Sequence, residues 1–267
     1  DKIDLIASNY KSESEISKIN INYSESQFIS DNLFEILKIA KDVENSSDGY
    51  YNIMLGKISA NLGFAPDFGV NILQKKISTF DINETNNSLI RYSRNWFDLS
   101  SIAKGYAVQQ IHNYLTLNNL DNHVIDIGGE IIINGYKHDK AWNIGIQNPL
   151  SNIDNATTSI SNKDGNFLAI ATSGEYRNFK LDESGNKVTH TINPKTLSSI
   201  KNNILSVTVI NEFSATHADA YATAFNAMGL NKAIEIANKQ NIAIMVMHHN
   251  SDNVNIIYSD KWYDLIQ

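Results

Sequence analysis

The stretch from Phe97 to Val108 constrains the fold most, because it joins a polar, glycine-containing segment to a helical pattern. Its sequence FDLSSIAKGYAV places a carboxylate, two hydroxyls, an ammonium and a glycine within eight residues. Apolar residues then recur at helical spacing and predict a helix with one face on a core. These residues are Ala103, Ala107, Ile111, Tyr114 and Leu115. The helix N-terminus would offer free backbone N–H groups to an anion, although an N-cap residue followed by a solvated lysine gives the same pattern.

Composition excludes several classes of protein. With 267 residues, 42% of them hydrophobic, the chain can bury a large core as one domain or as two lobes. A net charge of −7 argues against a nucleic-acid surface, which needs lysine and arginine to neutralise phosphates. The absence of cysteine excludes disulfides, thiolate metal sites and a thiol nucleophile. No apolar run reaches the roughly 20 residues of a membrane span, and no signal segment opens the sequence.

In the N-terminal part, residues 1–20 are expected to form a loop. Ser24 or Ser26 is expected to cap a helix that ends in the turn cluster at 45–49. Its buried stripe would be Leu33, Ile36, Leu37, Ala40 and Val43. Residues 49–69 have no clean period and indicate an irregular loop lining a cleft, in which Tyr50 or Tyr51 either stacks on a flat ligand or simply packs. Residues 77–97 predict a hairpin.

Further along, the patterns are mainly those of strands. Residues 123–134 predict a strand whose paired glycines, Gly128 and Gly129, mark either a bulge or a close backbone approach to a ligand. Residues 148–165 are expected to be a polar connection. Strands are expected at 167–172 and 205–210, hairpins at 176–192 and 242–258, and helices at 215–229 and 232–240. His248 and His249 would lie at the last turn as surface histidines.

The helix expected at 215–229 carries a second group of polar residues. Asp219 and Thr223 lie one turn apart, beside a stripe of Ala218, Ala222, Phe225 and Met228. A carboxylate and a hydroxyl are oxygen ligands that suit Mg²⁺, which completes its shell with water and phosphate oxygens. A capping or solvated aspartate beside an ordinary helical threonine would show the same spacing.

Several motifs occur in a fixed order along almost the whole chain. They are SNYKSESEISKIN, GYYNI with LGF, DLSSIAKGYAV, IDIGGEI, ATSGEYRNF, THTINPKT, and SVTVI followed by ADAYATAFNAMG. Together they resemble the ApbE family, the FAD:protein FMN transferases. The resemblance implies an α+β fold of mixed sheets packed with helices, in which residues 1–267 form one catalytic unit of two lobes with the flavin nucleotide in the cleft between them. The family's N-terminal strand, with a Met-Gly-Thr segment, is expected to be missing here.

The resemblance also implies roles for individual residues. Mg²⁺ would be held by Asp219, Thr223 and the backbone carbonyl of Ser101, and His190 would act as the base, since an imidazole accepts protons near neutral pH. Lys104 would add a second positive centre. FAD contacts would fall at Tyr10, Tyr50, Tyr51, Asn52, Asp98, Lys104, Ser173, Gly174 and Ile192. His190 could equally be structural, as an isolated histidine in a strand often is.

Some positions depart from the family pattern. Asn52 and Met54 stand where the family usually has Asp and Thr, and Leu62 replaces a Trp. Gln109 replaces an Asp and Leu197 a Gly. These changes bear on flavin affinity and the number of metal ions more than on the class of reaction.

The implied reaction is Mg²⁺-dependent transfer of FMN from FAD to a Thr or Ser hydroxyl of an acceptor protein, with release of AMP. No flavinylation motif occurs in this chain, so the acceptor would be a different protein that carries one, such as a subunit of a membrane redox complex. A Mg²⁺-dependent FAD pyrophosphatase and a non-catalytic flavin-binding protein remain alternatives. Resemblance to envelope members of the family implies a lipoprotein on the periplasmic face of a membrane, attached only through a lipid anchor upstream of Asp1.

Overall fold

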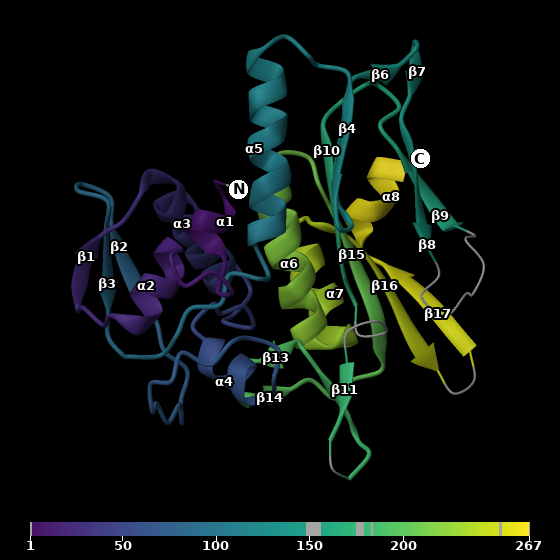
Figure 1. The fold of residues 1–267 in the computed structure, drawn as a ribbon. Coiled ribbons are helices and arrows are strands. Elements are labelled where there is room, and N and C mark those ends of the chain that lie inside the picture. Colours follow the sequence, from purple (N-terminus) through teal and green to yellow (C-terminus); the bar gives the residue numbers. More distant parts are fainter. Residues whose placement is uncertain (1, 148–155, 175–178, 183, 251–252, 267) are drawn as a thin grey trace. The chain divides into compact units, whose positions relative to one another are not determined.

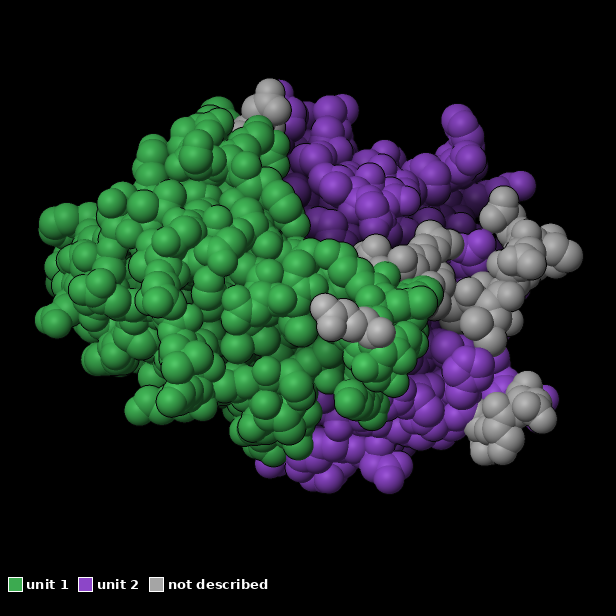
Figure 2. All heavy atoms as spheres, turned by 60° about the horizontal axis from the view of Figure 1, so that its bottom comes forward, with its two compact units in different colours: residues 1–103, 179–201 green, residues 104–178, 202–267 purple. Residues whose placement is uncertain are grey.

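The computed structural model describes residues 2–147, 156–174, 179–182, 184–250 and 253–266 (Figure 1). The chain divides into two compact units, coloured separately in Figure 2. Unit 1 comprises Asp1–Ala103 and Phe179–Lys201, and unit 2 comprises Lys104–Asn178 and Asn202–Gln267. Helices pack with several sheets, which confirms the expected α+β class. No helix among the described residues is both long and apolar enough to cross a membrane.

Unit 1 is built from short helices, a small sheet and two β-ribbons. Its helices are α1 (Asp4–Ala7), α2 (Glu15–Ile21), α3 (Asp31–Ser46) and α4 (Gly56–Asn61). The antiparallel sheet has the order β1 (Ser26–Phe28), β3 (Ser88–Arg91), β2 (Phe80–Asn83). The ribbons pair β11 (Phe179–Leu181) with β12 (Lys187–Thr189), and β13 (Ile192–Asn193) with β14 (Ser198–Ser199). The predicted apolar stripe of α3 is fully buried, as its spacing requires.

Unit 2 is centred on a six-stranded antiparallel sheet. Its order is β17 (Asn253–Tyr258), β16 (Ala243–Asn250), β15 (Ile204–Asn211), β10 (Leu168–Gly174), β5 (Glu130–Asn134) and β4 (His123–Ile127). Helix α6 (Ala215–Met228) packs on β10 and β15, and α7 (Leu230–Lys239) packs on α6 and β16 (Figure 1). Buried apolar residues of the sheet strands pack with Trp262 of α8 (Asp260–Ile266) in a hydrophobic core. The remaining elements are α5 (Ala103–Leu117) and the ribbons β6 (Tyr136–Lys137) with β7 (Lys140–Ala141) and β8 (Asn143–Gln147) with β9 (Ala156–Ser161).

Six local expectations were wrong. The apolar stripe expected for α5 is not its buried face, since Ile111 and Tyr114 are 40% and 66% exposed and the buried residues are Gly105, Tyr106 and Val108. The loop expected at 1–20 contains α1 and α2, and the irregular segment 49–69 contains α4. Helix α3 is capped by Ser30, whose hydroxyl accepts from Leu33 N at 3.2 Å, while Ser26 lies in β1. The connection expected at 148–165 contains β9, with 148–155 outside the described residues. His248 is 7% exposed, because β16 continues past it.

The glycine pair forms a turn between two strands and not a bulge within one strand, and a close approach of its backbone to a ligand stays a prediction. Gly128 and Gly129 form a two-residue hairpin turn between β4 and β5, with φ angles of 64° and 101°. Positive φ at both central positions is what this turn requires, and glycine adopts it without strain. The paired glycines therefore turn the chain directly into Glu130, the first residue of β5.

Candidate active site

Asp219 is a buried carboxylate at the contact between α5 and α6. Its side chain accepts a hydrogen bond from Gly105 N at 2.8 Å, and the residue is 5% exposed. A Cβ atom at position 105 would lie 2.6 Å from the Asp219 Cβ and closer still to the Ala215 carbonyl oxygen. Only glycine therefore permits the two helices to approach this closely. The alternative of a solvated aspartate does not fit this burial.

Gln109 ties α5 to the first turn of α6. Its Oε1 accepts a hydrogen bond from Ala215 N at 2.9 Å, which satisfies one of the free N–H groups at the start of that helix. The departure from the family's aspartate at this position therefore retains an oxygen acceptor for α6.

Glu130 was missed in the sequence, and it joins Lys104 in an ion pair beside this carboxylate. Lys104 Nζ contacts Glu130 Oε2, and the glutamate side chain is only 3% exposed whereas the lysine is 45% exposed. An ionisable residue opening an otherwise apolar strand, Glu-Ile-Ile-Ile, was the available signal, because such a residue is rarely buried without a partner.

The cluster of Glu130, Asp219 and Lys104 lacks positive charge. Burial, together with the charge of Asp219, raises the pKa of Glu130 to about 7, and the Lys104 ammonium opposes this rise. Burial likewise raises the pKa of Asp219 to about 6, against the opposing effects of Lys104 and the Gly105 N–H group. Two carboxyl groups thus share one ammonium in a site where ionisation is costly.

This arrangement fits a small divalent cation. A bound cation would favour ionised Asp219, and Thr223 follows one helical turn later in α6 with a half-buried side chain. Among the residues that the structure describes, no three His, Cys, Asp or Glu side chains are grouped to hold a metal. A cation here would therefore have few protein ligands, as Mg²⁺ commonly does in proteins.

Two further predicted residues of unit 2 end strand β10. Ser173 Oγ accepts a hydrogen bond from Asn226 Nδ2 at 3.4 Å, and Gly174 pairs with Ser206 of β15. Asn226 lies one turn beyond Thr223 on α6, so Ser173 is connected to the helix that carries Asp219. Residues 175–178 of the same motif lie outside the described residues.

In unit 1, the peptide before Asp98 is fixed by two asparagines. Asn9 and Asn20 both donate side-chain hydrogen bonds to Phe97 O, at 3.0 and 2.9 Å, and Phe97 N donates to Asn20 Oδ1 at 2.7 Å. Asp98 N donates to Ile53 O, and Ser100 N donates to Asp98 Oδ1 at 3.0 Å. The segment that leads into α5, as predicted from its sequence, is therefore held by residues from distant parts of unit 1.

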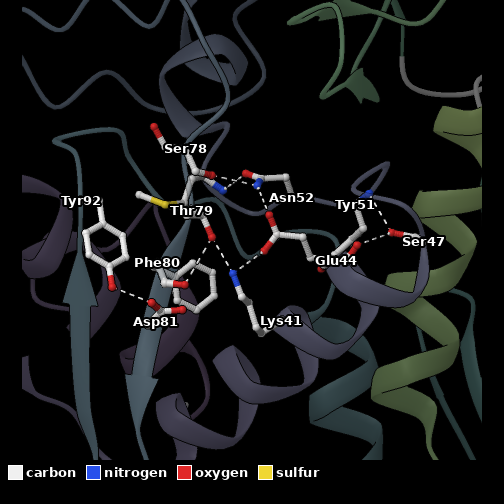
Figure 3. Close-up of polar contacts among 11 residues, drawn as sticks. Lys41, Glu44, Ser47, Tyr51, Asn52, Ser78, Thr79, Phe80, Asp81 and Tyr92 are labelled. Carbon is white, nitrogen blue, oxygen red and sulfur yellow. Dashed lines mark hydrogen bonds and ion pairs between the residues drawn. The ribbon is translucent and has the colours of Figure 1, made fainter.

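Tyr51 and Asn52 support this segment from within, and they expose almost no surface. Asn52 Nδ2 donates to Glu44 Oε1 at 2.8 Å and to Ser78 O at 3.0 Å (Figure 3), and its Oδ1 accepts from Met54 N. Tyr51 Oη lies 3.0 Å from Ser101 Oγ, and the ring is 2% exposed. Both residues therefore fix the loop, and their contacts with FAD stay predictions.

Two of the other predicted residues of unit 1, Tyr10 and His190, contact Phe64. Tyr10 is 74% exposed and donates from Oη to Phe64 O at 2.9 Å, while the half-buried His190 meets the Phe64 ring edge-on at 6.2 Å between centroids. Tyr50 has Lys195 Nζ 5.4 Å from its ring centre. Ile192 is 8% exposed in β13. How the residues of unit 1 meet Lys104 and Asp219 stays a prediction.

The fold corresponds to the class of flavin transferases. Among solved structures, the flavin transferase ApbE from Vibrio cholerae matches with a TM-score of 0.82 at 26% identity, covering 99% of this chain and 86% of that chain. Apo flavinyl transferase ApbE from Pseudomonas stutzeri matches in fold with a TM-score of 0.86 at 23% identity, covering 99% and 84%.

The sequence comparisons identify the family. The model of the ApbE family matches residues 1–246, so the chain belongs to the ApbE family. The chain is 28% identical over 257 residues to a FAD:protein FMN transferase of Vibrio cholerae, covering 92% of this chain and 75% of that protein. The corresponding Haemophilus influenzae protein is 29% identical over 262 residues, covering 90% and 73%.

Proposed function

We propose that this chain is an FAD:protein FMN transferase that requires Mg²⁺. The observation that carries the proposal is membership of the ApbE family over residues 1–246, with relatives named for this activity. The acceptor would be the hydroxyl of a Thr or Ser on another protein. Its oxygen bonds to the phosphorus of the FMN half of FAD, the bond from that phosphorus to the AMP oxygen breaks, and AMP leaves.

The roles of the residues are those that the resemblance to the family implies, and the chemistry of each side chain suits its role. His190 accepts the proton of the incoming hydroxyl. Lys104 would supply positive charge to the diphosphate, and Asp219, Thr223 and the Ser101 carbonyl are the groups that would hold the cation. Mg²⁺, when bound, neutralises charge that develops on the diphosphate oxygens. The fixed segment at Asp98 and the exposed Tyr10 orient the nucleotide.

Mass spectrometry of a candidate acceptor tests the proposal directly. Incubation with the protein, FAD and Mg²⁺ should add one FMN to the acceptor and release an equal amount of AMP. If FMN and AMP are released at the same rate with acceptor as without it, the protein is a pyrophosphatase instead. Binding of FAD with no AMP under any condition would identify a flavin-binding protein.

We also propose that the natural protein works at the periplasmic face of a membrane, as a lipid-anchored protein acting on a subunit of a membrane redox complex. The support is resemblance to envelope members of the family. Fractionation of cells that express the natural gene, with an antibody against this chain, should find it with the envelope. Recovery in the cytoplasmic fraction alone would contradict the proposal.

A further inference from the structure

We propose that Glu130 is a positioning residue, which holds the Lys104 ammonium away from Asp219 and so keeps that carboxylate free for a divalent cation. The inference rests on the proposed function and deepens it. It concerns three residues of unit 2 whose contacts lie within that unit.

The first step is that Lys104 lies next to the cation site. Its own backbone directly precedes Gly105, whose N–H group donates to Asp219 at 2.8 Å. The ammonium sits on a flexible four-carbon stem and is 45% exposed. Its charge already acts on Asp219, where it favours the ionised form. The lysine is therefore a competitor for the same carboxylate.

The second step is that Glu130 captures this ammonium. Lys104 Nζ makes its ion pair with Glu130 Oε2, and in the described part of the chain no ion pair joins Lys104 to Asp219. Lys104 has one fixed partner although two carboxylates lie near it.

The third step is that Glu130 is the rigid member of the pair. It follows the glycine turn at Gly128 and Gly129, opens β5, and pairs with Ile127 of β4. Its side chain is 3% exposed, so its rotamers are limited by packing, whereas Lys104 is free on one side. A fixed carboxylate that holds a mobile ammonium determines where that ammonium lies.

The consequence concerns competition. If the ammonium paired with Asp219, a cation would have to displace it before binding. Mg²⁺ takes few protein ligands, so it would lose its one charged ligand in this cluster. Neutralising Glu130 should therefore weaken Mg²⁺ binding through the lysine, and not only through the loss of one negative charge.

A double-mutant cycle separates these two effects. Mg²⁺ binding would be measured by calorimetry on the full chain without FAD, for wild type, Glu130→Gln, Lys104→Met and the double variant. We expect Glu130→Gln to weaken binding roughly 10- to 100-fold, as loss of an outer partner of a metal site does. In the Lys104→Met background the same change should cost about twofold or less. Equal losses in both backgrounds would overturn the inference.

A second variant keeps the negative charge at position 130 but shortens the side chain that contacts Lys104. Glu130→Asp retains a carboxylate on a side chain one methylene shorter, so it should release Lys104 and weaken Mg²⁺ binding as Glu130→Gln does. Binding equal to that of wild type would contradict a positioning role. Glu235→Gln is the matched control, because Glu235 pairs with Lys232 at 2.7 Å on an exposed face of the same unit and should have no effect.

Thermal melts of each variant establish that it folds. The apparent Mg²⁺ requirement of FMN transfer should follow the same non-additive pattern as binding. If Mg²⁺ binding by wild type and the variants shows this pattern but the wild type transfers no FMN, the proposed function is overturned and the role of Glu130 stands. A wild type that binds no Mg²⁺ would overturn the inference.

Discussion

At the scale of single residues, Asp219 is the most consequential position, because one buried carboxylate both joins two helices and faces a shortage of positive charge. Asp219→Asn keeps an oxygen that can accept from Gly105 N but removes the charge. We expect Mg²⁺-dependent FMN transfer to fall on the order of 10²- to 10³-fold, the usual size for one electrostatic group. Thr223→Ala should be milder, since it removes a neutral ligand.

Steady-state rates at limiting Mg²⁺ measure this effect. Asp264→Asn, an exposed aspartate of α8, provides the control for a change of charge in the same unit. Turnover of Asp219→Asn close to that of wild type would show that the metal assignment is wrong.

His190 is the residue where a structural and a catalytic role differ most in their consequences. If it is the general base, His190→Asn should lower transfer to the acceptor hydroxyl roughly 10²- to 10⁴-fold and leave FAD affinity nearly unchanged. The loss should shrink at high pH, where the acceptor needs less help to release its proton. Transfer rates against pH, with FAD binding measured separately, test this.

His249→Asn is a suitable control, because His249 is exposed at the end of β16. Parallel losses of FAD affinity and turnover, independent of pH, would assign His190 to the architecture around Phe64 instead.

At the scale of elements, the turn between β13 and β14 contains a strained leucine. Leu197 has φ 54° where the family usually has glycine. The left-handed region costs a residue with a Cβ roughly 1–2 kcal/mol of stability. Glycine avoids this cost, but its greater freedom in the unfolded chain lowers stability by about 0.5–1 kcal/mol. Leu197→Gly should therefore raise the free energy of unfolding by about 0.5 kcal/mol.

Denaturant unfolding of Leu197→Gly and Leu197→Ala together checks this origin. Alanine keeps its Cβ and so keeps the strain, and it should give no gain. A gain of equal size in both variants would point to the leucine side chain rather than the backbone.

At the scale of the whole molecule, the raised pKa values of Glu130 and Asp219 link stability to pH. Both folded pKa values lie above their ordinary values of 4.5 and 3.8, so the folded state holds protons that the unfolded chain releases. Stability should therefore be greatest in acid and fall as pH rises from about 4 to about 7, by on the order of 1–3 kcal/mol. His112, whose pKa burial lowers, acts in the opposite sense.

Denaturant unfolding at pH 5 and pH 8 measures this fall, and comparison with Glu130→Gln isolates the contribution of the cluster. The variant should lose less stability between the two pH values than wild type. Added Mg²⁺ should restore stability at pH 8 more than at pH 5, because it binds the ionised carboxylates. A fall of the same size in wild type and variant would exclude the cluster as its source.

Much of the molecule could be predicted from the sequence alone. The stripe of α3, the hairpin of β2 and β3, and α6 with Asp219 follow from local periodicity, and the motifs together identify the family. The position of helix α5 after its polar segment was also predicted, but its buried face was not. Each is specified by residues close together in the chain, where spacing determines which side chains share a face. The same reasoning failed at 1–20 and 148–165, where short elements have too few residues to show a period.

Tertiary structure decided the chemistry around those elements. Spacing in the sequence does not show that Gly105 allows α5 to approach α6 closely. Nor does it show that Asn9 and Asn20 bind Phe97 from 88 and 77 residues away. The burial of Tyr51 and Asn52 likewise appears only in the folded chain. Glu130 is the clearest case, because its partner Lys104 lies 26 residues earlier. Burial and charge pairing depend on distances in space, so only the folded chain determines that Glu130, and not Asp219, forms the ion pair with Lys104.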